Sequence, residues 1–294
     1  MLFLLAAYSL PGIARDPDYY AASSKLASGK WAKIKVERTG MQFVSNATLN
    51  SLGFKDPSKV NAYGYGGALI SEELYGIQPD DLPIVPTVHT ATGILFFGND
   101  IVRRTESTDN ETMMFAHSAN PYSDDSWYFL SDIDVKEKAI AQAEPLTPTD
   151  RIVTTFTEQL IYEKDLVAPS NTGRVLLGED FRSPSSRTFP FQLQDNAGQD
   201  VRFRVGFATN TPSASSSLIF SVNGTRLPAI NSDVIPAITN VEQFMRYNTT
   251  VHTAKNAGNN MQLTIQFNGQ GTIQMARLDY IEVEYDRELK LTDG

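Results

Sequence analysis

Short runs of alternating apolar and polar residues dominate the chain after about its first twenty positions. Each run is bounded by Gly, Asn, Asp or Pro, a pattern typical of β-strands joined by turns, because successive side chains point to opposite faces of a strand. In the first half, strands are predicted at residues 31–37, 60–65, 94–97 and 127–130. Only residues 46–52 and 134–143 show a helical pattern, and both segments are short.

The second half of the chain carries longer and more regular alternating runs. They predict strands at residues 151–164, 188–193, 201–208, 217–223, 261–268 and 278–285. Strands at this spacing, joined by Asn-Gly and Asn-Ala-Gly turns, favour an antiparallel sandwich or jelly roll. We therefore predict an all-β, mainly antiparallel fold, with an N-terminal β-rich domain at 21–145 and a jelly-roll β-sandwich at 151–290. The proline-containing polar stretch 141–150 is the expected linker.

The last predicted strand has one apolar and one mixed face. Ile281, Val283 and Tyr285 lie on the apolar face, whereas the other face carries Leu278, Tyr280, Glu282 and Glu284. Two carboxylates roughly 6 to 7 Å apart on one strand face are compatible with the paired acids of a glycoside hydrolase. A solvated outer face explains Glu282 and Glu284 equally well and is far commoner, so solvation is the expected environment and hydrolysis the minor alternative.

Residues 1–10 (MLFLLAAYSL) are almost entirely apolar and end at Pro11. Ten residues are too few to span a bilayer, and no other stretch is apolar enough for a transmembrane helix. The run fits the hydrophobic segment of a signal peptide, with Ala7-Tyr8-Ser9 as a small-x-small cleavage site, although a positively charged leader does not precede it. We expect residues 1–20 to be a leader remnant; a buried N-terminal strand of a cytosolic domain is the alternative.

Composition removes several classes of function. The chain has 294 residues and no Cys, which excludes a cysteine nucleophile, thiol redox chemistry and Cys-ligated zinc. Its net charge of -9, from 25 Lys plus Arg and 34 Asp plus Glu, argues against nucleic acid as a partner, because a phosphate backbone would be repelled.

Motifs for catalysis and metal binding are weak. Residues 64–67 (GYGG) resemble the start of a dinucleotide loop, but Leu69 stands at the third glycine position and no βαβ pattern follows. His89, His117 and His252 are far apart in sequence, and none is paired at metal-ligand spacing. We expect no cofactor. Calcium remains an alternative at the acidic groups Asp80-Asp81, Asp124-Asp125 and Asp132 to Asp134, none of which has the EF-hand pattern.

An aromatic cluster lies in residues 121–130 (PYSDDSWYFL). Tyr122, Trp127 and Tyr128 are the candidate contacts to a glycan or a protein partner, because exposed planar rings on a β scaffold stack on sugars. Alternation buries about half of such side chains, so a contribution to the core is the competing interpretation.

A set of short motifs occurs in a fixed order along the chain. They are 26–54 (LASGKWAKIKVERTGMQFVSNATLNSLGF), 56–60 (DPSKV), 63–67 (YGYGG), 80–83 (DDLP), 120–122 (NPY) with 128–130 (YFL), 162–167 (YEKDLV), 173–174 (GR), 178–181 (GEDF) and 278–282 (LDYIE). Together they resemble the N-terminal region of the gingipain-type cysteine peptidases, most closely the sortases of type IX secretion. Residues 40–43 and 175–177 depart from that pattern.

The resemblance implies a non-catalytic part of such a protein. In that family the catalytic Cys and His lie in an α/β domain that follows the β region, and neither residue has a counterpart in this chain. The function implied is an exported accessory β module in the periplasm, outer membrane or cell surface of a Gram-negative bacterium. Its partners would be a downstream peptidase domain or secretion-system proteins. The alternative function is a carbohydrate-binding or adhesive module.

Overall fold

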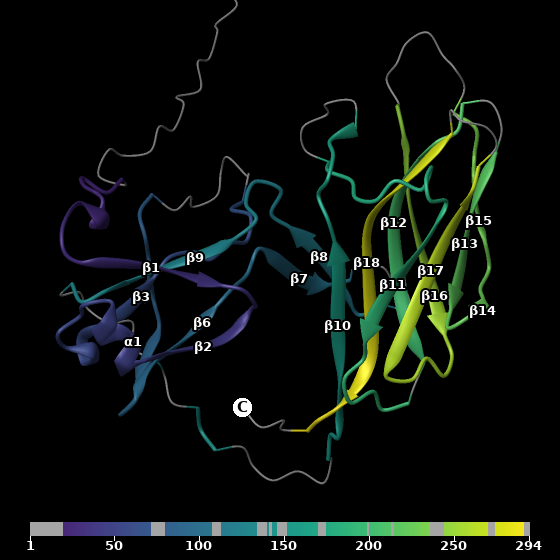
Figure 1. Cartoon of the computed structure of the whole chain (residues 1–294). Helices are drawn as coiled ribbons and strands as arrows, with labels where there is room; N and C mark the ends of the chain where they lie inside the picture. Colours follow the sequence, from purple (N-terminus) through teal and green to yellow (C-terminus); the bar gives the residue numbers. More distant parts are fainter. Residues whose placement is uncertain are drawn as a thin grey trace, which may run out of the picture. The chain divides into compact units, whose positions relative to one another are not determined.

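The computed structural model describes most of the chain (Figure 1). The described residues are 20–71, 80–107, 113–133, 140, 143–145, 152–169, 175–198, 200–212, 215–235, 244–269 and 274–290. Residues 1–19 of the predicted leader, with the cleavage site, lie outside them, as do most of the predicted helix at 134–143 and of the linker at 141–150.

The chain divides into two compact units. The first comprises Met1–Arg103 and Ser123–Ala143, and the second comprises Arg104–Tyr122 and Glu144–Gly294. The expected domains, 21–145 and 151–290, are two uninterrupted segments joined by one linker, and their bounds stay a prediction. Residues 104–122 lie between the two segments of the first unit along the sequence, but they group with the second unit. We call residues 104–122 the excursion; a single linker between two domains does not account for it.

The described residues of the first unit form two antiparallel sheets. One has the order β1 (Trp31–Val36), β9 (Ser126–Ser131), β3 (Asn61–Tyr63), β4 (Ile84–Val85), and the other has the order β2 (Gly40–Ser45), β6 (Gly93–Gly98), β5 (Thr87–His89). The helical segments are short: η2 (Lys25–Ala27), α1 (Asn46–Ser51) and η3 (Pro57–Lys59).

Helix α1 forms where the sequence predicted one. The Ser45 hydroxyl accepts a hydrogen bond from the Thr48 N–H at 3.1 Å and so caps the first turn, while Leu49 turns inward and is fully buried. The core of the first unit consists of Val36, Leu49, Phe54, Val60, Ala62, Ile94, Phe96, Tyr128 and Leu130.

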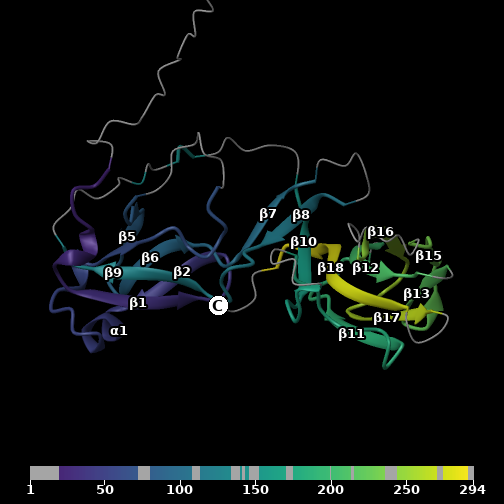
Figure 2. The same ribbon diagram turned by 90° about the horizontal axis from the view of Figure 1, so that it is seen from above.

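The second unit is a β-sandwich. One sheet has the order β10 (Thr155–Glu163), β18 (Met275–Glu288), β12 (Val201–Asn210), β16 (Arg246–Ala254). The facing sheet has the order β11 (Ser186–Gln192), β17 (Asn260–Asn268), β13 (Ser216–Val222), β14 (Thr225–Arg226), and β15 (Ile230–Ser232) also pairs with β13 (Figure 2). The predicted all-β fold is confirmed, and this strand order is compatible with the expected jelly-roll connections. Strands β7 (Val102–Glu106) and β8 (Phe115–Ala119), which lie largely within the excursion, pair as a two-stranded sheet.

The two sheets of the sandwich enclose a continuous apolar core. Alternate residues of the long strands fill it, including Val201, Phe203, Val205 and Phe207 from β12. Ile281, Val283 and Tyr285 lie in the same core, so the prediction that they form one buried apolar face is confirmed.

A β-bulge changes the register of β18 at Asp279. Gly206 pairs with Tyr280 but Phe207 pairs with Leu278, so one residue of β18 is extra at this point. Leu278 therefore faces the core and is 1 % exposed. The prediction that Leu278 shares a face with Tyr280, Glu282 and Glu284 is wrong, because an inserted residue reverses the alternation.

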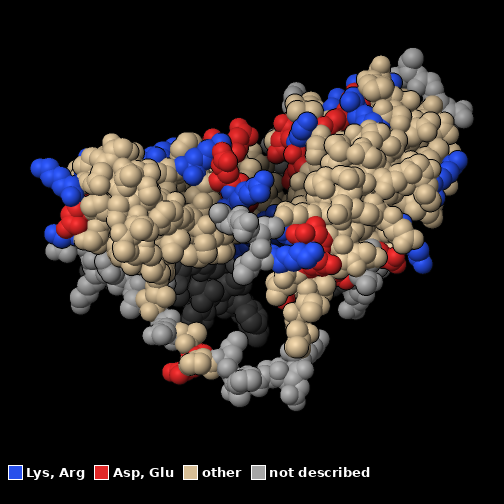
Figure 3. All heavy atoms as spheres, turned by 60° about the horizontal axis from the view of Figure 1, so that its bottom comes forward, with Lys and Arg blue, Asp and Glu red and all other residues tan. Residues whose placement is uncertain are grey.

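On the face of the molecule drawn in Figure 3, Lys and Arg lie near Asp and Glu. Among the coloured residues of Figure 3, blue and red groups lie beside one another on each unit, without a continuous basic area. Within the part of the chain that is described, no helix is long and apolar enough to cross a membrane.

The bulge predicts a difference between two leucine substitutions. Leu278→Ala removes a buried side chain and should lower the free energy of unfolding by about 2 to 5 kcal/mol. Leu166→Ala, at a position 62 % exposed, should change it by less than about 0.5 kcal/mol. Urea denaturation followed by circular dichroism measures both, and equal small effects would contradict the bulged register.

Candidate functional site

Glu282 and Glu284 lie on the face of the sandwich that looks away from its core. The antiparallel register places Gln159 beside Glu284 and pairs Arg204 with Glu282. The two glutamates are only 1 % and 0 % exposed, so the expected solvated face is wrong. We call Gln159, Glu163, Arg204, Glu282 and Glu284 the polar face.

Described residues of the excursion lie against the polar face and donate main-chain hydrogen bonds to it. Glu284 accepts the N–H of Met114 at 2.8 Å and of Phe115 at 2.6 Å, one on each carboxylate oxygen. Glu282 accepts the N–H of His117 at 3.0 Å. Sequence reasoning missed this cover, because the donors are main-chain groups about 170 residues away and carry no residue-type signal.

His117 lies between two carboxylates. Its Nδ1 is 2.6 Å from Glu282 Oε1 and its Nε2 is 2.9 Å from Glu163 Oε2, and its side chain is 2 % exposed. Burial alone would lower the pKa of His117, but the hydrogen bonds to Glu163 and Glu282 and the charges of these groups raise the pKa to about 9. The imidazolium therefore donates to both acids at neutral pH.

Arg204 completes the compensation of charge. Its guanidinium is 2.6 Å from Glu282 Oε2, and the same group donates to the Phe115 carbonyl at 3.4 Å and to the Ser107 hydroxyl at 3.3 Å. Arg202 lies 3.9 Å from Glu284. The oxygens of both glutamates are thus engaged by protein donors, an arrangement suited to holding a chain segment and not to attack on a glycosidic bond.

A second surface feature is an exposed apolar sheet face in the first unit. Met41 pairs with Phe97, and Leu95 pairs with both Phe43 and Val88, so these five side chains share the outer face of β2, β6 and β5. Met41, Phe43, Phe97 and Val88 are 62 %, 53 %, 52 % and 41 % exposed. We call these five residues the apolar face; such contiguous exposure marks interaction sites in soluble proteins.

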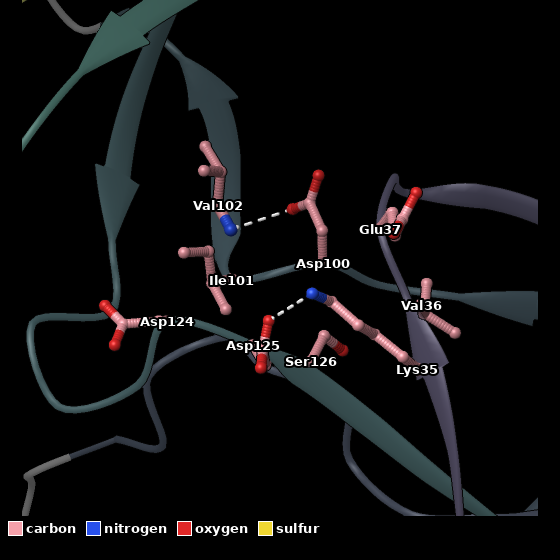
Figure 4. Close-up of a pocket in the computed structure, with 9 residues that line it drawn as sticks. All are labelled: Lys35, Val36, Glu37, Asp100, Ile101, Val102, Asp124, Asp125 and Ser126. Carbon is pink, nitrogen blue, oxygen red and sulfur yellow. Dashed lines mark hydrogen bonds and ion pairs between the residues drawn. The ribbon is translucent and has the colours of Figure 1, made fainter.

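A small cavity of about 310 Å³ lies elsewhere in the first unit (Figure 4). Lys35 extends across it to Asp125 at 2.6 Å, and this hydrogen bond and charge raise the pKa of Lys35. Asp100 and Asp124 also line the cavity, but Asp100 already accepts the Val102 N–H at 2.8 Å. Four of the residues that line the cavity are acidic, namely Glu37, Asp100, Asp124 and Asp125. Apart from these carboxylates, no described feature of the cavity resembles a cation site.

The acidic groups considered for calcium have protein partners in part. Asp81 accepts the N–H of Lys25 and of Leu82, each at 2.8 Å, and so organises a loop. Among the described ranges, no three His, Asp or Glu residues are grouped so that they could hold a metal ion. Asp134 lies outside the described residues, and calcium binding stays a prediction.

The three aromatic candidates occupy different environments. Tyr128 is 2 % exposed within the core, where its hydroxyl accepts the Asn99 N–H, so its ring is not presented for stacking. Trp127 is half-buried, and the Lys33 ammonium lies 4.0 Å from the centre of its ring. Tyr122 is 67 % exposed and belongs to the other unit. Glycan binding at these residues stays a prediction, with Tyr122 its most accessible ring.

The remaining histidines have structural environments. His89 Nε2 is 2.9 Å from the Val60 carbonyl, and His252 stacks on Phe203 and packs against Phe220 in the sandwich. Burial lowers the pKa of His252. Neither His89 nor His252 lies with His117 in a metal-binding group among the described residues. The sequence analysis likewise found no histidines paired at metal-ligand spacing.

The fold and its surfaces define a two-unit, all-β module. No family model matches the chain, and no curated protein matches it. Among solved structures, it is similar to dimeric latent PorU from Porphyromonas gingivalis, with a TM-score of 0.78 and 26% identity over 91% of this chain and 25% of that chain. The chain therefore spans about a quarter of that PorU chain, and the similarity supports the PorU-like relation predicted from the motifs.

Two sugar-binding proteins match less well. The carbohydrate-binding module CBM36 matches with a TM-score of 0.21 and 19% identity, over 33% of this chain and 71% of that chain. The sugar-binding C-terminal domain of EclA matches with a TM-score of 0.26 and 12% identity, over 49% of this chain and 89% of that chain. At these TM-scores neither match bears on function.

Charge compensation on the polar face predicts a large effect of Arg204→Met. The variant leaves Glu282 buried without its guanidinium partner, which should cost about 3 to 5 kcal/mol of unfolding free energy. Arg246→Met is the matched control, because Arg246 pairs with Asp233, which is 82 % exposed, and should cost less than about 1 kcal/mol. Chemical denaturation compares the two; similar losses would contradict the compensating role of Arg204.

The raised pKa of His117 predicts a loss of stability in alkali. The pKa of His117 in the folded chain, about 9, exceeds the ordinary histidine pKa of 6.5, so the contribution is complete below pH 6.5 and is lost as the pH rises through 9. The loss should be on the order of 3 kcal/mol. Urea midpoints between pH 6 and 10 measure it, and His117→Gln should flatten this part of the profile. An identical pH profile in the variant would refute the assignment.

Proposed function

We propose that this chain is an exported, non-catalytic accessory β module of a PorU-like protein, and that it contacts the peptidase portion of that protein. The observation that carries this proposal is the similarity to latent PorU over 91% of the chain, which accounts for only 25% of the PorU chain. The absence of Cys from the 294 residues supports a non-catalytic role, because a cysteine peptidase needs a thiol.

The apolar face is the proposed contact surface. Four of its side chains are more than 40 % exposed, and its outward positions on β2, β6 and β5 carry no charged residue in a chain whose net charge is -9. A second copy of the chain would bring the same negative charge, so electrostatics favours a different protein. An uncharged apolar surface on the peptidase portion would match the apolar face in chemistry and would not be repelled by the negative charge of the chain.

Substitution of the exposed phenylalanines tests the contact. Phe43→Ser and Phe97→Ser should each weaken binding to the peptidase portion of a PorU-like protein by about tenfold or more, because each removes a large apolar side chain from the interface. Calorimetric titration with the separately purified peptidase portion measures the affinity. Thermal denaturation should remain close to that of the unmodified chain, since both rings are exposed.

Ile70→Ser is the matched control. Ile70 is 49 % exposed and lies outside β2, β6 and β5, so its substitution should leave the affinity unchanged. Failure of the unmodified chain to bind the peptidase portion would refute the accessory function. Binding that is insensitive to Phe43→Ser and Phe97→Ser would refute the apolar face as its site.

A further inference from the structure

The polar face of the sandwich holds a peptide segment mainly through its backbone. The segment, which we call the strap, is residues 113–119 of the excursion. Glu284 accepts the N–H groups of Met114 and Phe115, Glu282 accepts the N–H of His117, and Arg204 donates to the Phe115 carbonyl. Main-chain groups are present in almost every sequence, so these four contacts fit an extended peptide in general.

One position of the strap is selected by charge. The His117 ring lies between Glu163 and Glu282 and packs edge-on against Tyr280, with ring centres 4.8 Å apart. Each ring nitrogen of His117 thus contacts a carboxylate oxygen. A basic side chain therefore fits here, whereas an acidic side chain would be repelled by Glu163 and Glu282.

The strap leaves part of the polar face unused. Gln159 is 4 % exposed, and within the described part of the chain neither its amide oxygen nor its amide nitrogen has a hydrogen-bond partner. Gln159 is paired with Glu284 across the strands, directly beside the contacts to Met114 and Phe115. An unsatisfied buried amide costs free energy, so a different peptide that reaches Gln159 would gain hydrogen bonds that the strap does not make.

Few apolar contacts hold the strap in place. None of its residues belongs to the sandwich core among the described residues, and Met114 is 52 % exposed. Met113 is the one strap residue with a buried apolar side chain. Hydrogen bonds exchange for bonds to water when a segment opens, so a segment held by polar contacts can open at lower cost than the core.

We propose that the polar face is a peptide-binding site that the strap fills intramolecularly, and that its ligand is an extended segment of a partner with a basic side chain at the His117 position. The strap then acts as an internal competitor. This inference does not depend on the PorU-like function or on the apolar face, which lies in the other unit.

Hydrogen exchange in the unmodified chain tests whether the strap opens. The amides of Met114, Phe115 and His117 should exchange by a local opening, at least a hundredfold faster than those of Val205 and Val283 in the core strands. Their exchange rates should also depend less on urea. Exchange of the strap amides only together with the core strands would overturn the proposal.

A peptide competition tests whether the site accepts a separate segment. The probe is residues 113–120 (MMFAHSAN) with blocked ends, titrated into the full chain carrying His117→Ala, which weakens the internal competitor and retains Glu163 and Glu282. The control is the same peptide N-methylated at the residues equivalent to Met114, Phe115 and His117. A second control carries Glu at the His117 position.

The expected result is saturable binding of the probe and at least tenfold weaker binding of both control peptides. Circular dichroism establishes that the His117→Ala chain is folded, and the exchange experiment on the unmodified chain decides the question if it is not. No binding to a folded variant would overturn the proposal, as would equal binding of the N-methylated peptide.

Discussion

The burial of two glutamates is the constraint on which the second unit depends. Glu282 and Glu284 have almost no exposed surface, and ionised carboxylates in that position require donors for their oxygens. The sandwich provides Arg204, and the excursion provides three main-chain N–H groups and His117. The position of the excursion follows from this requirement. The same requirement for hydrogen-bond donors explains why residues 104–122 group with the second unit, although the chain before and after them belongs to the first.

Different forces hold the two faces of the same sheet. The inner face contributes side chains such as Phe203 and Ile281 to a close-packed apolar core, where burial from water is the stabilising term. The outer face is held by charge-assisted hydrogen bonds, whose net contribution depends on every partner being present. The core therefore supplies the apolar part of the stability of the sandwich, whereas the polar face contributes charge-assisted bonds and determines which segment covers it. The peptide-site proposal follows from this separation.

The first unit presents an opposite arrangement. Its sheet of β2, β6 and β5 buries Ile94 and Phe96 on one side and exposes Phe43 and Phe97 on the other. This uncharged, exposed sheet face is the surface proposed above to contact another protein.

Local patterning determined much of the fold. Alternation identified most of the long strands of the sandwich but missed β16 (Arg246–Ala254). The apolar side chains at Ile281, Val283 and Tyr285 predicted the buried face of β18, because period-two burial is a property of one strand and its neighbours. Three results required the tertiary structure. The bulge at Asp279 moves Leu278 into the core, an inserted residue that hydropathy does not mark. The environment of Glu282 and Glu284 is set by main-chain donors about 170 residues away. Exposure of Phe43 and Phe97 depends on what covers the sheet, and an apolar side chain in a strand has the same sequence signal whether it is covered or not.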